Sequence, residues 1–169
     1  IFCTNISKFL ITLMGKDGVI KQDTQQIGFR TSGMNGGQPA FSNCGNYFVL
    51  EFGYQNRSFQ LFDFDRNTGR LSNFRLLTNN LINQLYYIGY SFSPDDSKMY
   101  FTASNASRTW NRLYQFDLSN GTSASDIMSS LRLIHQESSG NEMSKHSLGP
   151  DGKIYIASWK LHDGVTEKP

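Results

Sequence analysis

The chain has 169 residues, which is long enough for one domain with a sizeable hydrophobic core. Aromatic residues make up 14% of it and charged residues 18%, a composition that favours β-structure and excludes a disordered polypeptide. The formal net charge of +2 is too small to indicate a nucleic-acid or anionic-membrane partner, and no apolar run reaches the roughly 18 residues that span a bilayer.

The chain begins with three short apolar runs, at residues 1–4, 9–13 and 19–20. Gly15-Lys-Asp-Gly18, between the second and third runs, has the composition of a β-hairpin turn. The polar, glycine-rich stretch that ends at Gly37 is typical of a connection. We therefore expect residues 1–37 to be the end of a preceding unit of β-structure.

Residues 38–84 are predicted to form the first complete unit, with strands at 47–52 and 58–64 and a turn at Asp65-Arg-Asn-Thr-Gly69. Oxygen-bearing side chains alternate around that turn, as they do in calcium-binding loops. The EF-hand pattern, however, requires glycine one position earlier and glutamate where this chain has Phe74. We therefore expect a structural turn without a metal ion.

Residues 85–140 are predicted to form the next unit. Phe92-Ser-Pro-Asp-Asp-Ser-Lys-Met-Tyr-Phe101 indicates a turn between two strands, because Pro94 presets the φ of a turn position. A third strand is predicted at 112–117 and a fourth at 127–134. Residues 123–133 also fit a short helix capped by Ser125, but we expect a loop and a strand there.

A third unit is predicted at residues 141–169, entered through a loop at 135–142. Its turn, Leu148-Gly-Pro-Asp-Gly-Lys-Ile-Tyr-Ile-Ala157, repeats the pattern of the preceding unit.

The units recur at a nearly constant spacing. Phe41, Phe92 and Leu148 begin equivalent turns that lie 51 and 56 residues apart, and residues 61–69 align without a gap to residues 113–121. A period near 50, with four short strands in each unit, is typical of β-propeller blades. We predict an all-β segment of about three four-stranded antiparallel blades. Because closed rings contain about 4 to 8 blades, we expect the segment to belong to a larger ring completed by further blades of the same polypeptide.

Five aromatic residues fall at predicted strand ends or in linkers, namely Trp110, Trp159, Tyr54, Tyr86 and Tyr87. Loops on a rigid scaffold commonly carry binding residues, so these side chains are candidates for a ligand rim. Packing between blades is the alternative for each of them.

Glu142 and His146 lie four residues apart, just before the last predicted strand pair. An ion site or an acid/base pair there is one interpretation, and a surface loop is the other. No nucleophile elbow, phosphate loop or dinucleotide motif is present, so we expect no cofactor. Cys3 and Cys44 are candidates for a disulfide between neighbouring blades or for free thiols.

The turns at 92–101 and 148–157 resemble the Ser-Pro-Asp-Gly blades of TolB-like and WD-repeat-like propellers. Residues 90–104, 112–121 and 147–158 together look like the propeller region of large secreted or surface proteins from Bacteroidetes. The first repeat departs from the pattern at Asn43-Cys-Gly45, where Pro-Asp is missing. The resemblance implies a secreted or cell-surface bacterial protein.

The resemblance favours a non-enzymatic binding module whose ligand is a protein or a glycan. A second resemblance, of Asp65-Arg-Asn-Thr-Gly-Arg-Leu71 to lactonase-like propellers, implies a hydrolytic enzyme as the alternative function. A purely architectural spacer is a third possibility.

Overall fold

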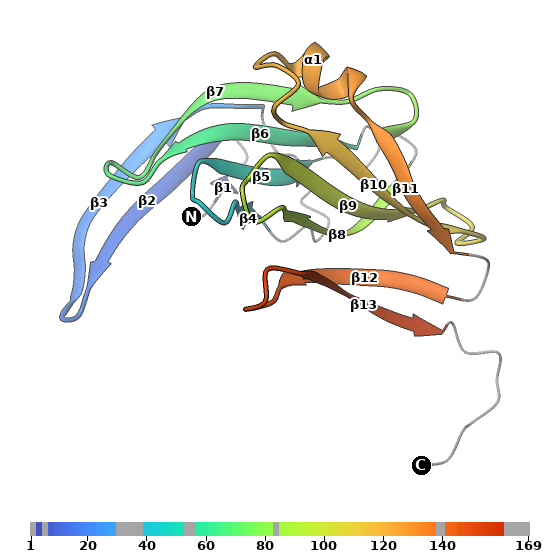
Figure 1. The fold of residues 1–169 in the computed structure, drawn as a ribbon. Coiled ribbons are helices and arrows are strands. Elements are labelled where there is room, and N and C mark those ends of the chain that lie inside the picture. The colour runs from blue at the N-terminus through green and yellow to red at the C-terminus, as the bar shows by residue number, and fades with distance from the viewer. Residues whose placement is uncertain are drawn as a thin grey trace.

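The computed structural model describes residues 3–4, 7–29, 39–52, 57–82, 85–137 and 141–160. These residues form antiparallel sheets that follow one another in chain order (Figure 1). The elements are β1 (Cys3–Thr4), β2 (Lys8–Gly15), β3 (Gly18–Gln26), β4 (Ala40–Phe41), β5 (Tyr47–Phe52), β6 (Ser58–Asp65), β7 (Arg70–Leu77), β8 (Tyr86–Phe92), β9 (Lys98–Ser104), β10 (Asn111–Asp117), α1 (Ala124–Ser129), β11 (Arg132–Glu137), β12 (Asn141–Leu148) and β13 (Ile154–Lys160).

Two of the described sheets have four strands, in the orders β4-β5-β6-β7 and β8-β9-β10-β11. A three-stranded sheet, β1-β2-β3, precedes them, and a two-stranded sheet, β12-β13, follows. Each strand pairs with its neighbour in sequence, as in the meander of a propeller blade. The chain is a segment of a β-propeller, so the predicted all-β fold is confirmed. We number the sheets one to four in chain order.

The turn between the first and second strands has the same local geometry in sheets two, three and four. In each, the fourth residue of the turn donates its backbone N–H to the carbonyl of the first at 3.0 Å. That fourth residue is left-handed in every case, with φ of 73° at Gly45, 59° at Asp96 and 75° at Gly152. Glycine adopts this conformation without strain, and aspartate is among the few other residues that tolerate it. The sequence repeat therefore corresponds to a structural repeat.

Asp96 also joins the turns of two neighbouring sheets. Its buried carboxylate accepts a hydrogen bond of 2.6 Å from the Ser42 hydroxyl and two of 3.1 Å from the Cys44 backbone N–H. The Asn43 side chain donates to the carbonyl of Phe92 at 3.0 Å. These bonds hold the turns of sheets two and three together.

The main core lies between sheets two and three. Phe59 of β6 is fully buried, and its ring centroid lies 5.1 Å from that of Phe101 on β9 and 6.4 Å from that of Phe116 on β10. Apolar faces of this kind bury their surface only against a neighbouring sheet, at about 25 cal/mol per Å² of apolar area. Sheets two and three are therefore stacked face to face.

The other two sheet interfaces are smaller. Sheet one packs Phe9 against Phe62 of sheet two, with ring centroids 5.7 Å apart. The backbone of sheet four contacts sheet three directly. The Thr102 hydroxyl of β9 donates a hydrogen bond to the Ser144 carbonyl of β12 at 3.1 Å. A Cβ added at Gly89 would lie 2.4 Å from that same carbonyl oxygen, so the close approach requires glycine.

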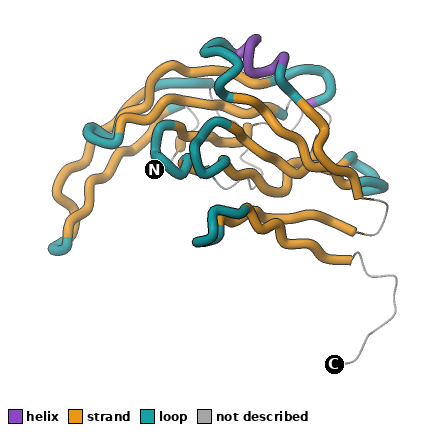
Figure 2. The backbone as a smooth tube through the Cα atoms, viewed as in Figure 1, coloured by secondary structure: helices purple, strands orange, loops and turns teal. Residues whose placement is uncertain are grey.

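The helix α1 corrects the prediction of a loop and a strand at 123–134 (Figure 2). Ser123, not Ser125, is its N-cap, and the Ser123 hydroxyl accepts a hydrogen bond of 3.1 Å from the Asp126 backbone N–H. Ile127 anchors the helix in the main core, where it is only 1% exposed. The outer strand follows at β11, so both elements fit between β10 and β12.

The predicted loop at 135–142 is also corrected. β11 continues to Glu137 and β12 begins at Asn141, so Glu142 lies within a strand. None of the helices among the described residues is long and apolar enough to cross a membrane.

Replacing Phe116 with Ala should lower the free energy of unfolding by about 3–5 kcal/mol, because it leaves a cavity in a fully buried part of the core. Leu133→Ala, on the adjacent strand and 46% exposed, should change it by less than about 1 kcal/mol. Urea unfolding of both variants measures the difference. Equal losses would show that the sheets do not bury Phe116 as described.

Candidate functional site

The strand directions give each sheet two distinct ends. One end carries the turns between the first and second strands and between the third and fourth strands, and we call it the turn end. The other end carries the connections between the second and third strands and the links to the next sheet, and we call it the connection end. The predicted aromatic residues that the structure describes, Tyr86, Tyr87, Trp110 and Trp159, map to the connection end.

At the connection end, an arginine of one sheet contacts the first strand of the next sheet. The Arg57 guanidinium lies over the Tyr86 ring, 3.8 Å from its centroid. One sheet further, Arg108 Nη1 lies 3.4 Å from Glu142 Oε1. Tyr86 and Glu142 occupy matching places at the starts of β8 and β12, so the same contact recurs with different chemistry.

Two tryptophans extend this row of side chains. Trp159 on β13 pairs directly opposite Glu142 and is 50% exposed, whereas Glu142 is 4% exposed. Trp110 precedes β10, and the Arg112 guanidinium lies 4.0 Å from its ring centroid. We define the rim as Arg57, Tyr86, Arg108, Trp110, Glu142 and Trp159.

Buried polar atoms without hydrogen-bond partners lie in the rim and next to it. Within the described part of the chain, both side-chain polar atoms of Asn111, which follows Trp110, have no hydrogen-bond partner, and Glu142 Oε1 has only its ion pair with Arg108. Buried polar groups in native proteins nearly always have a partner, whether protein, water or ligand. Water or a bound molecule would supply the partners that the described residues do not.

The other two predicted aromatics do not belong to the rim. Tyr87 packs into the core, with its ring centroid 4.4 Å from that of Phe59, and its hydroxyl donates to the Ile82 carbonyl at 2.8 Å. For Tyr87 the packing alternative is correct. Tyr54 lies outside the described residues.

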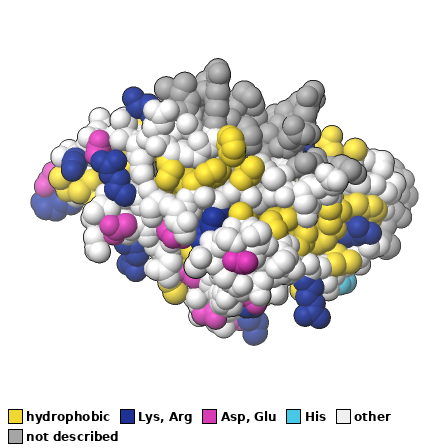
Figure 3. Space-filling model, turned by 90° about the horizontal axis from the view of Figure 1, so that it is seen from above, with side chains coloured by type: hydrophobic (Ala, Val, Ile, Leu, Met, Phe, Trp, Pro, Cys, Tyr) yellow, Lys and Arg dark blue, Asp and Glu magenta, His cyan; other side chains and the backbone are white. Residues whose placement is uncertain are grey.

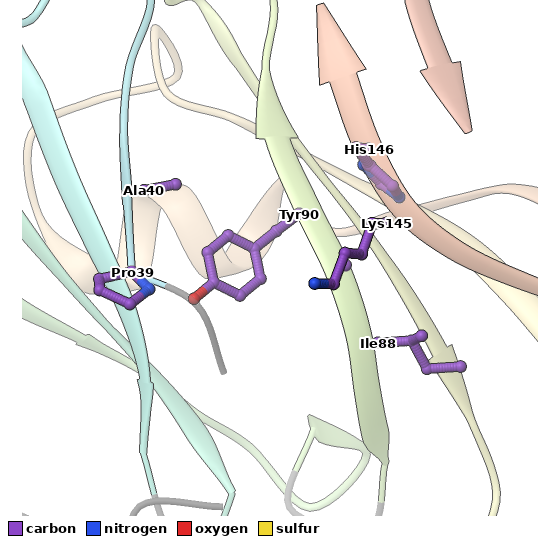
Figure 4. A pocket seen from close by; sticks show the side chains of 7 residues that line it. Pro39, Ala40, Ile88, Tyr90, Lys145 and His146 are labelled. Atoms are coloured by element: carbon purple, nitrogen blue, oxygen red, sulfur yellow. The ribbon is translucent and has the colours of Figure 1, made fainter. Parts of the chain in front are cut away.

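The first strands of sheets two, three and four enclose a cavity of about 190 Å³. It is lined by Pro39, Ala40, Ile88, Gly89, Tyr90, Lys145 and His146. In Figure 4, Tyr90 extends from β8 toward Pro39 and Ala40, and Lys145 extends from β12 toward Tyr90. We call this space the channel cavity, because the first strand of each propeller blade faces the central channel.

His146 forms a bridge between sheets three and four. Its Nδ1 lies 2.9 Å from the Ser91 hydroxyl, while its buried Nε2 has no partner within the described residues. Burial lowers the pKa of His146 to about 4, so the imidazole is neutral at pH 7. Glu142 faces Arg108 instead, so the structure does not bring the predicted acid/base pair together.

Glu51 is a site residue that the sequence did not reveal. It is 9% exposed at the end of β5, and its Oε1 lies 3.7 Å from Arg57 Nη1. Burial raises the pKa of Glu51 to about 7, against the opposing effect of Arg57. Glu51 could not be found from the sequence, because only the fold places it next to Arg57 of the rim.

No cluster of three or more His, Cys, Asp or Glu side chains that could hold a metal ion occurs among the described residues. The Asp65 carboxylate instead accepts hydrogen bonds from the Asn67 backbone N–H at 2.9 Å and the Thr68 hydroxyl at 2.6 Å, as in a structural turn. Cys44 is an exposed free thiol, so it is not bonded to Cys3.

No protein-family model matches the sequence, and no curated protein matches it. Solved structures of similar fold include a candidate dipeptidyl aminopeptidase IV from Bacteroides ovatus ATCC 8483, with 11% identity over 72% of this chain and a TM-score of 0.41. The β-propeller domain of Myceliophteria thermophila Cps50 (Swd1) has 13% identity over 94% of this chain and a TM-score of 0.45. The matches cover 22% and 49% of those two chains, so this chain spans less than half of either.

Two buried groups, Glu51 and His146, should change the free energy of unfolding with pH in opposite directions. The folded state raises the pKa of Glu51 to about 7, so Glu51 makes the free energy of unfolding fall as pH rises from about 4.5 to 7. The folded state lowers the pKa of His146 to about 4, so His146 makes it rise between pH 4 and about 6.5. The exposed carboxylates Asp95 and Asp117 have pKa values of about 2, because side-chain hydrogen bonds lower them, and do not titrate in this window.

Urea unfolding of the full chain at pH 4.5, 5.5 and 6.5 separates the two groups. For Glu51→Gln the free energy of unfolding should rise with pH, and for His146→Gln it should fall, each by up to about 1.4 kcal/mol per pH unit. Slopes of the same sign in the two variants would contradict the burial described for these side chains.

Proposed function

We propose that the chain is a non-enzymatic binding module that presents its rim to a protein or glycan ligand. The observation that carries this proposal is the row of contacts at the connection end, in which arginines orient exposed aromatic and buried acidic side chains of successive sheets. Tyrosine, tryptophan and arginine are the residues most enriched in binding hot spots.

The side chains of the rim are also restricted before a ligand binds. Stacking of Arg57 on Tyr86 and of Arg112 on Trp110 restricts these side chains before binding, which reduces the entropy lost on association. Trp159 is half exposed and lies opposite Glu142, whose Oε1 is ion-paired with Arg108 but accepts no hydrogen bond within the described residues. An apolar surface next to a buried polar acceptor suits a ligand with alternating apolar and hydrogen-bond-donating groups.

The wider setting follows from the sequence motifs. We propose that the module belongs to a secreted or cell-surface bacterial protein of the Bacteroidetes type, with TolB-like blades at residues 38–84 and 85–140. Residues 1–37 would end a preceding blade and residues 141–169 would begin the next one. Further blades of the same polypeptide would then cover the exposed face of β13.

A hydrolytic enzyme is the second candidate function, and the Ser91–His146 contact favours it, since a hydroxyl within hydrogen-bond reach of an imidazole is the geometry of a nucleophile and its base. Two observations weigh against catalysis. Ser91 does not line the channel cavity, and no carboxylate orients His146 among the described residues. Turnover of p-nitrophenyl butyrate or of a γ-lactone that Ser91→Ala abolishes would establish the enzyme.

The binding proposal is tested on arrays of glycans and of extracellular protein domains. Trp159→Ala and Tyr86→Ala should each lower the affinity for a ligand that binds the wild-type chain by about tenfold or more. Tyr155→Ala is the matched control, because Tyr155 is 57% exposed at the opposite end of the same strand as Trp159. A ligand that both rim variants retain, or that Tyr155→Ala loses equally, would place binding elsewhere.

A further inference from the structure

A second cavity lies between sheets one and two at the turn end, away from the rim. Its volume is about 720 Å³, within the range of small-molecule sites. In Figure 1, the β2–β3 hairpin extends past the turn between β6 and β7. Phe9 packs against Phe62 farther along the two sheets, and Asp23 and Gln25 of β3 bond to Arg70 and Leu71 of β7 beside the cavity. We call this space the cleft.

Four apolar side chains, Ile11, Leu13, Phe41 and Phe64, line the cleft together with polar and charged ones. Phe41 is 46% exposed there, and its ring centroid lies 4.7 Å from that of Phe64. On the β2 side of the cleft, Leu13 is 54% exposed and Ile11 lies beside Gly69 of the β6–β7 turn. A Cβ added at Gly69 would lie 3.2 Å from Ile11 Cγ2, so glycine permits this approach. Exposed apolar side chains that face each other across a cavity are typical of ligand sites.

The charges that line the cleft are unbalanced. Arg70 pairs with Asp23, which leaves Lys21 and Arg66 as two uncompensated positive charges. Lys21 has no hydrogen-bond or ion-pair partner within the described part of the chain. In Figure 3, the end of the molecule that carries β2 and β3 shows hydrophobic side chains beside Lys and Arg side chains.

Arg66 is held in place at the edge of the cleft. Its Nη1 donates to the Cys44 carbonyl at 3.2 Å, and its side chain lies over Gly45, where an added Cβ would be 2.7 Å from Arg66 Cδ. The neighbouring Asp65 carboxylate is occupied by its own turn and does not line the cleft. The guanidinium therefore keeps donors available for an anion.

We propose that the cleft binds a small anionic amphiphile, with an alkyl or aryl body against Phe41, Phe64 and Ile11 and one carboxylate or sulfonate group between Lys21 and Arg66. The apolar side chains select the body, and the net positive charge selects the anion over a neutral or cationic analogue. This site is separate from the rim and does not depend on the proposed function there.

The test is calorimetric titration of the full chain with decanoate, octanoate and decyltrimethylammonium, each below its micellar concentration. Decanoate should bind about tenfold more tightly than octanoate, because two further methylene groups are buried. Decyltrimethylammonium has the same alkyl body with the opposite charge and should not bind. Equal affinity of the cation and the anion would overturn the proposal, as would the absence of decanoate binding.

Substitutions locate the site. Lys21→Gln and Arg66→Gln should each weaken decanoate binding by about tenfold, through loss of a charge-assisted hydrogen bond. Phe41→Ala should weaken it without changing the preference for the anion. Lys153→Gln is the matched control, since Lys153 is an exposed lysine at the turn end of sheet four. Thermal unfolding of each variant shows whether it remains folded.

Two results would refute this assignment. One is an unchanged affinity in folded Lys21→Gln and Arg66→Gln variants. The other is concentration-dependent dimerisation in sedimentation velocity that Phe41→Ala abolishes, since the cleft would then be an interface between two copies of the chain.

Discussion

Contact between aromatic side chains of successive sheets is the interaction on which this structure depends. Phe59 and Phe101 come from different sheets, and neither is exposed to solvent. A single four-stranded sheet with two apolar faces cannot bury both by itself, so each sheet is stable only beside its neighbours. Hydrogen bonds at the edges, such as those of Asp96 and Thr102, fix how the sheets meet and add directional specificity.

The sheet stacking also determines where binding groups can lie. Because the sheets repeat in one orientation, the connection ends form one continuous surface and the turn ends form another. Arg57 and Arg108 reach across sheet boundaries only at the connection end, so aromatic and acidic side chains collect there. At the turn end, sheets one and two border a cleft lined by apolar side chains and by Lys21 and Arg66. The two surfaces differ in shape, size and charge, and suit ligands of different chemistry.

Much of the fold was predictable, because the turns carry local signals. Glycine or aspartate occupies the left-handed position in all three turns, Pro-Asp precedes it in two of them, and the spacing of the turns predicted the blades. The helix α1 was not predicted, because the repeat pattern indicates a strand wherever the adjacent unit has one. Glu142 was placed in a loop because the polar sequence of β12 has low β-propensity, whereas pairing with β13 and packing on Gly89 make it a strand.

The candidate site was predictable only in part. Tyr86, Trp110 and Trp159 were found because they flank predicted strands, but Tyr87 at the next position packs into the core. A strand that alternates between two buried faces gives no sequence signal to separate such neighbours. Arg57 and Arg108 come from the sheet that precedes their partners, and residues of two sheets line the cleft, so neither is encoded in any short stretch. In an alignment of the repeats, His146 occupies the position equivalent to Tyr90, and both residues line the channel cavity.

A double-mutant cycle between Phe59 and Phe101 tests the stacking of successive sheets most directly, using Phe59→Leu, Phe101→Leu and the double variant in urea unfolding. Aromatic contact across the sheet boundary should give a coupling energy of about 0.5–1.5 kcal/mol. A coupling energy indistinguishable from zero, with both single variants destabilised, would show that the two sheets are stabilised independently and do not stack as blades.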